Sequence, residues 1–216
     1  MTRHIRMRTV QRFIALLVVA GAASSCSSTT KQGTGPMYLT MDQLQAAQGN
    51  KTTTLTSFLL SDVVTNVTSP PPCTSDAPCP TIFNDVGQAT FHAFLKDIGN
   101  PATPSAPTSN NQVTITRYHV SYVRADGRNT QGVDVPYAFD GAATGTIPVG
   151  GALTLGFEWV RHDAKMEAPL VQLRGTANII TTIATVTFYG TDAVGNAISV
   201  SGSLQIDFGN FGDSSS

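Results

Sequence analysis

Residues 178–208 alternate between apolar and polar side chains in two halves joined by a short polar span. A repeat of two residues is typical of a β-strand that buries one face. The span at residues 190–196 contains Gly190 and Gly195, which predicts the reversal of an antiparallel hairpin. Such a hairpin is not stable alone in water, so the rest of the chain must supply an opposing sheet. The apolar positions are Ala184, Val186, Phe188, Ile198, Val200, Leu204, Ile206 and Phe208.

Other segments repeat this alternation. Residues 88–96 and 152–161 place apolar side chains at every second position, although Phe94 breaks the pattern. Trp159, the only tryptophan, has apolar neighbours two and four residues before it, so we expect it in the core. Residues 52–67 are rich in β-branched side chains and predict the first strand, with an interruption near Ser61 and Asp62.

Residues 113–124 predict a strand whose inward side changes along its length. The inward positions end at Ile115 and resume at Tyr118, so a β-bulge is expected near Thr116 and Arg117.

Two short edge strands are predicted at residues 133–139 and 143–149, each marked by a proline. Only 12% of the residues are charged, which favours turn-rich β structure over long helices or disorder. The sequence therefore predicts an all-β domain, an antiparallel two-sheet sandwich of seven to eight strands at residues 51–210.

The N-terminus has the pattern of a secretory signal. Residues 1–12 carry four arginines, and residues 13–23 are continuously apolar or small. This apolar run is shorter than the roughly 20 residues that a membrane-spanning helix needs, so a retained span is the weaker interpretation.

The sequence Ala23-Ser24-Ser25-Cys26 resembles the lipobox of bacterial lipoproteins. The resemblance implies a signal peptide at residues 1–25 and lipid on the sulfur of Cys26, which would hold the exported chain at a membrane of the cell envelope. By the same resemblance, Ser27 favours the outer membrane if the source is Gram-negative. The alternative is ordinary signal-peptide cleavage after Ala22.

Residues 26–50 are expected to form the lipidated cysteine, a flexible tether and a short helix. The tether is polar and contains glycine and proline. Thr40 and Gln43 have the spacing of a capping box, which predicts a helix that continues to Gln48. Residues 211–216 are predicted to be a disordered tail.

Cys73 and Cys79 lie in a proline-rich stretch that predicts an exposed loop. They are the only cysteines left once Cys26 carries lipid, and an exported chain meets an oxidising compartment, so a disulfide is predicted. The alternative, a metal or redox pair, is disfavoured because their spacing matches neither kind of motif.

The strand order and the hairpin, most clearly over residues 113–208, resemble immunoglobulin-like and fibronectin-III-like modules of bacterial envelope proteins. This resemblance implies an immunoglobulin-like sandwich. The cysteine and tryptophan spacing of true immunoglobulin domains is absent.

The charge of the chain argues against nucleic-acid binding. The formal net charge is −1, but four of the 13 basic residues lie in the leader. Without the leader, nine basic residues stand against 14 acidic ones, a net charge of −5 with no basic cluster.

No motif for phosphate binding or nucleophilic catalysis occurs, and no catalytic residue, metal site or cofactor is predicted. Structural interpretations are favoured for every remaining candidate. These candidates are a His92–His119 pair, His162 beside Asp163, calcium ligands among Asp126, Asp134, Asp192 and Asn196, and an aromatic sugar platform among Tyr118, Tyr122, Tyr137, Phe139 and Tyr189.

The sequence thus predicts a non-enzymatic, lipid-anchored envelope protein with a structural, adhesive or assembly role. The alternative is a surface module that binds carbohydrate or peptide through aromatic residues and the long loops at residues 68–86 and 99–112. An envelope hydrolase ranks third, because catalytic groups can converge from loops without a sequence motif. The sequence identifies no particular glycan or protein partner.

Overall fold

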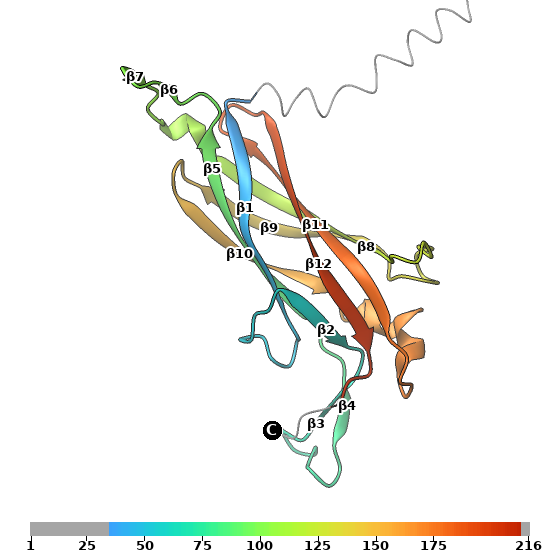
Figure 1. Cartoon of the computed structure of the whole chain (residues 1–216). Helices are drawn as coiled ribbons and strands as arrows, with labels where there is room; N and C mark the ends of the chain where they lie inside the picture. Colours follow the sequence, from blue (N-terminus) through green and yellow to red (C-terminus); the bar gives the residue numbers. More distant parts are fainter. Residues whose placement is uncertain (1–34, 213–216) are drawn as a thin grey trace, which may run out of the picture.

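The computed structural model describes residues 35–212, which form two packed sheets (Figure 1). The three-stranded sheet has the order β1-β5-β10, and the five-stranded sheet has the order β2-β12-β11-β8-β9. The strands of the first sheet are β1 (Met37–Ala47), β5 (Asp85–Leu95) and β10 (Ala152–Val160). Those of the second are β2 (Phe58–Asp62), β8 (Val113–Val123), β9 (Phe139–Ile147), β11 (Ile180–Asp192) and β12 (Ala197–Gly209).

Short elements extend the ends of the sandwich. Two small hairpins are formed by β3 (Thr65–Val67) with β4 (Cys79–Thr81) and by β6 (Gly99–Asn100) with β7 (Thr103–Pro104). Three 3₁₀ helices occur, η1 (Ser109–Asn111), η2 (Asp163–Met166) and η3 (Leu170–Leu173), and there is no α-helix within residues 35–212. The predicted all-β class is confirmed.

The pairing of the strands departs from the prediction at one place. All neighbours within the two large sheets are antiparallel except β2 and β12, which run parallel from Phe58–Gln205 to Asp62–Gly209. The prediction of a wholly antiparallel sandwich is therefore wrong for this pair. Its partners are separated by most of the chain, and no local pattern of side chains specifies such a pairing.

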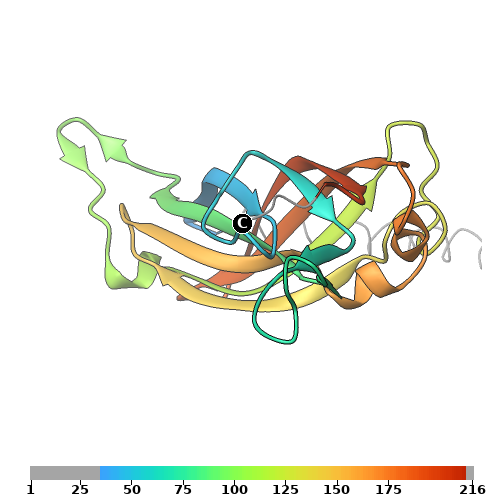
Figure 2. The ribbon, with the colours of Figure 1, turned by 90° about the horizontal axis from the view of Figure 1, so that it is seen from below.

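The core lies between the two sheets, which form separate layers in Figure 2. It is rich in aromatic rings. Phe188 of β11 packs against Phe91 of β5 and Phe157 of β10, with ring centroids 4.8 and 5.2 Å apart. Trp159 is fully buried, as predicted, and its Nε1 donates to the carbonyl oxygen of Gln45 at 3.1 Å. The predicted inward positions of β11 and β12 face this core, including Val186, Leu204 and Ile206.

The predicted hairpin and bulge are both present. Strands β11 and β12 pair in continuous register from Ile180–Phe208 to Thr191–Ala197. In β8, Arg117 pairs with Tyr189 and Ile115 pairs with Gly190, so Thr116 is the extra residue. The bulge turns both Thr116 and Arg117 outward and returns Tyr118 to the core.

The helix predicted through Gln48 is wrong, because β1 occupies this segment. Strand β1 pairs with β5 over ten residue pairs and buries Met37, Ala46 and Ala47. This burial and pairing outweigh a local capping signal, since an isolated helix of this length is marginal. The folded domain thus includes residues that were assigned to the tether and helix.

Two other boundaries differ from the prediction. Within residues 52–67 the strand begins only at Phe58, and it is divided into β2 and β3 by a break after Asp62, where an interruption was expected. Residues 133–139 are mostly loop, with one isolated bridge at Val135. Of the two predicted edge strands, only the second is therefore present, as β9 at one edge of the five-stranded sheet. The predicted signal peptide, Cys26, residues 27–34 of the tether and residues 213–216 of the tail lie outside the described residues.

The two ends of the described chain lie at opposite ends of the sandwich (Figure 1). The carbonyl oxygen of Pro36 accepts a hydrogen bond from the Lys96 amide at 2.9 Å, which places the start beside the end of β5 and the β6–β7 hairpin. The last described residues lie beside the end of β2, where the Phe211 amide donates to Asp62 Oδ1 at 3.3 Å.

Candidate functional site

Four side chains from three strands meet on the outer face of the five-stranded sheet. We call Arg117, His119, Asp140 and Tyr189 the outer-face cluster. The Arg117 guanidinium lies over the Tyr189 ring, 3.8 Å from its centroid. The same guanidinium and the His119 Nδ1 approach one oxygen of Asp140 at 3.3 and 3.2 Å.

Strand register and the bulge bring these residues together. Arg117 faces Tyr189 across β8 and β11, while His119 faces Asp140 across β8 and β9. The extra residue Thr116 allows Ile115 and Tyr118, which are three residues apart, both to face the core, and it leaves Arg117 on the outer face. The sequence indicated the bulge, His119 and the outward Tyr189, but it gave no reason to select Asp140.

Pairs of hydroxyl groups lie on the same outer face. Thr185 and Ser203 are 2.8 Å apart, as are Thr187 and Ser201. These pairs come from β11 and β12, next to the outer-face cluster on β8, β9 and β11. The surface therefore combines a partly exposed ring, a carboxylate, a guanidinium, an imidazole and hydroxyls, which suits hydrogen bonding and stacking with a polyhydroxylated ligand.

The structure does not bring the predicted histidine pair together. His92 lies on β5 and His119 on β8, and these strands belong to different sheets. His92 instead contacts Asp42 of β1. His162 contacts its neighbour Asp163 at 3.4 Å in an exposed position.

Most of the proposed aromatic platform belongs to the core. Tyr118, Tyr122 and Phe139 are buried, and burial raises the pKa of both tyrosines. The hydroxyl of Tyr122 donates to the carbonyl oxygen of Trp159. Tyr137 is half-exposed and Tyr189 belongs to the outer-face cluster.

Sequence reasoning missed an exposed aromatic pair on the three-stranded sheet. Tyr38 of β1 stacks on Phe94 of β5 with ring centroids 5.3 Å apart. The broken alternation at Phe94 was the available signal, because it marks an aromatic side chain that points away from the core.

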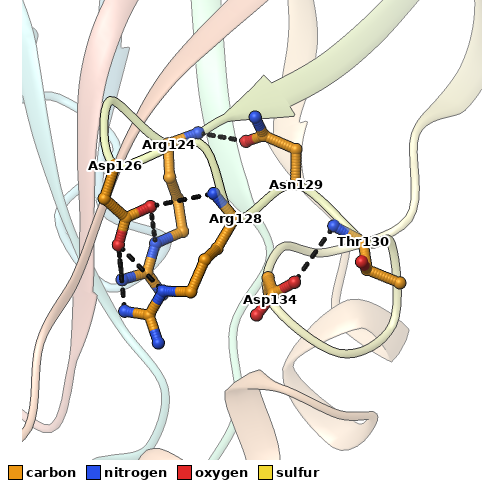
Figure 3. A network of polar contacts seen from close by, with 6 residues as sticks. All are labelled: Arg124, Asp126, Arg128, Asn129, Thr130 and Asp134. Atoms are coloured by element: carbon orange, nitrogen blue, oxygen red, sulfur yellow. Dashed lines mark hydrogen bonds and ion pairs between the residues drawn. The ribbon is translucent and has the colours of Figure 1, made fainter.

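The loop after β8 is held by its own polar contacts (Figure 3). The carboxylate of Asp126 accepts hydrogen bonds from Arg124 at 3.1 and 2.6 Å and from the side chain of Arg128 at 3.0 and 2.9 Å. The bonds from Arg124 are the largest cause of the lowered pKa of Asp126, which is about 2. Asp134 accepts from the Thr130 amide at 3.2 Å.

The aspartates considered as calcium ligands are thus engaged in turns. Asp192 accepts from the amides of Val194 and Asn196 at 3.2 and 2.8 Å within the β11–β12 turn. In the part of the chain that the structure describes, no three His, Cys, Asp or Glu side chains are grouped to hold a metal ion.

Cys73 and Cys79 are joined as predicted, with a sulfur–sulfur distance of 2.07 Å. The bond closes the loop between β3 and β4. Cys26 lies outside the described residues.

Comparisons with models of protein families, with curated proteins and with solved structures find no match to this chain. Within residues 35–212 no helix has the length and apolar character needed to cross a membrane.

Proposed function

We propose that this chain is a lipid-anchored protein of the bacterial cell envelope whose all-β domain has a structural, adhesive or assembly role. The observation that carries the proposal is the run of apolar residues that ends in Ala23-Ser24-Ser25-Cys26. The disulfide between Cys73 and Cys79 supports export, because such bonds persist in oxidising compartments.

We also propose that the sandwich is immunoglobulin-like. Among the eight strands of the two large sheets, the first, third and sixth along the chain form one sheet. The fourth, seventh and eighth adjoin one another in the other sheet, and the fifth extends it beside the fourth. This distribution follows the A, B, E and C, F, G arrangement of immunoglobulin domains, with β9 in the place of strand C′.

Metabolic labelling with a palmitate analogue tests the anchor. The wild-type protein is expected to take up label and to sediment with membranes, whereas Cys26→Ala is expected to do neither. Cys73→Ala is the matched control, because it removes another cysteine but leaves the lipobox intact. Equal labelling of wild type and Cys26→Ala would show that Cys26 carries no lipid.

A carbohydrate-binding role is the second candidate, and the outer-face cluster is the observation that favours it. A carboxylate held by an arginine and a histidine side chain can accept hydrogen bonds from sugar hydroxyls, and the Tyr189 ring adds an apolar surface. The flanking hydroxyl pairs extend this polar face.

A glycan array provides the measurement for this candidate. Wild-type protein is expected to bind a defined set of oligosaccharides, and Asp140→Asn is expected to weaken that binding at least tenfold. Asp207→Asn is the control, since Asp207 lies on β12 and hydrogen-bonds with Gln205 rather than with the cluster. Absence of binding at high protein concentration would rule against this role.

A further inference from the structure

The side chains of Lys165 and Asp85 meet in the buried interior, away from the surfaces described above. Lys165 lies in η2, within the connection from β10 to β11, and Asp85 is the first residue of β5. Both side chains are 1% exposed, and Lys165 Nζ is 2.8 Å from Asp85 Oδ2. Lysine is almost never buried to this extent without a specific partner.

Three residues from two further segments, Gly49 and the end of β2, hold this pair in place. The Ser61 hydroxyl donates to Asp85 Oδ2 at 2.6 Å, and the Gly49 amide donates to Oδ1 at 3.1 Å. Lys165 Nζ also donates to the carbonyl oxygen of Asp62 at 2.8 Å. The two reactive groups are therefore fixed in contact by residues far apart in the sequence.

Burial disfavours the charged form of Asp85. Loss of solvation raises the pKa of Asp85, while the charge and hydrogen bond of Lys165 oppose the rise. A buried ion pair recovers its desolvation cost only in part through mutual attraction. Elimination of water between the two groups would remove both charges.

We propose that Lys165 and Asp85 condense to form an intramolecular amide. A bond forms between Lys165 Nζ and the Asp85 Cγ, and the bond from Cγ to Oδ2 breaks. Together, –NH₃⁺ and –COO⁻ give –CO–NH– and one H₂O, so atoms and charge balance without an added reagent. The link fixes the connection between β10 and β11 to the start of β5.

The neighbours of the pair have positions that assist this step. The Gly49 amide faces Oδ1, the retained oxygen, where negative charge develops in the tetrahedral intermediate. The Ser61 hydroxyl faces Oδ2, the oxygen that leaves. Because the fold holds Lys165 Nζ 2.8 Å from an oxygen of the Asp85 carboxyl group, no encounter in solution is needed, and such proximity accelerates reactions by large factors.

Tryptic digestion of the reduced full-length protein, followed by mass spectrometry, tests the link. Trypsin cleaves after Lys51, Lys96, Arg161 and Arg174, and an amide on Lys165 blocks cleavage after that residue. The expected product joins residues 52–96 to residues 162–174, with the mass of one water less than their sum. Recovery of residues 162–165 and 166–174 as separate peptides would refute the link.

Variants identify the groups that react. Asp85→Ala and Lys165→Arg are expected to abolish the joined product, and Ser61→Ala is expected to lower the joined fraction in freshly synthesised protein. If a variant fails to fold, the wild-type digest alone decides the question. Because Cys26 takes no part, the same digest of Cys26→Ala separates this inference from the proposed anchor.

Discussion

At the residue scale, alternation predicted buried positions well and polar partners poorly. Val186, Phe188 and Trp159 lie in the core as their spacing indicated. The partnership of Asp85 with Lys165 could not be predicted, because it joins residues that are distant in sequence and depends on sheet packing. Likewise, Asp140 gave no local signal for its contacts with Arg117 and His119.

Asp126 provides a pH-dependent test of the loop after β8. Its pKa falls from an ordinary value of 3.8 to about 2 in the folded protein, chiefly through hydrogen bonds from Arg124. Because the folded protein favours the charged form of Asp126 more strongly than the unfolded chain does, this carboxylate stabilises the fold at pH values above 3.8. The stabilisation is lost as the pH falls through about 2.

We therefore expect Asp126→Asn to lower the urea midpoint slightly at pH 7, with the difference from wild type shrinking between pH 4 and pH 2. Urea unfolding at a series of pH values measures this difference. Asp97→Asn, in another exposed loop, serves as control. A difference independent of pH would contradict the assigned role of the Asp126 carboxylate.

At the scale of elements, the long alternating segments were predictable because their side chains report directly on burial. Strand β11, its turn and β12 follow from the sequence alone, and so does the bulge in β8. Strand β1 was mistaken for a helix because its burial is intermittent and a second bulge between Met41 and Gln43 interrupts its register. Its assignment depends on pairing with β5.

Phe188 tests how strongly β11 joins the two sheets. Its ring contacts Phe91 and Phe157, both from the opposing sheet. Phe188→Ala is expected to destabilise the protein by about 3–5 kcal/mol, because it leaves a cavity among these rings. Thr187→Ala, one residue away on the outer face, should cost far less. Chemical denaturation of both variants measures the difference, and equal losses would place Phe188 outside the core.

At the scale of the whole molecule, the class of fold was predictable but the order of its strands was not. The alternation of apolar and polar residues predicted strands with one apolar face, and such strands must pack as two sheets. The order of strands within each sheet depends instead on contacts between segments that are distant in the sequence. The parallel pairing of β2 with β12 illustrates this limit, because it joins strands near the two ends of the domain.

That parallel pair has a mechanical consequence. The chain enters and leaves the sandwich at opposite ends, so tension along the molecule pulls roughly parallel to its long strands (Figure 1). Once β1 has separated from β5, the hydrogen bonds between β2 and β12 are loaded together in shear, instead of breaking one after another. We therefore expect the force needed to unfold the domain by stretching to be higher than it would be if the five residue pairs of β2 and β12 broke one at a time.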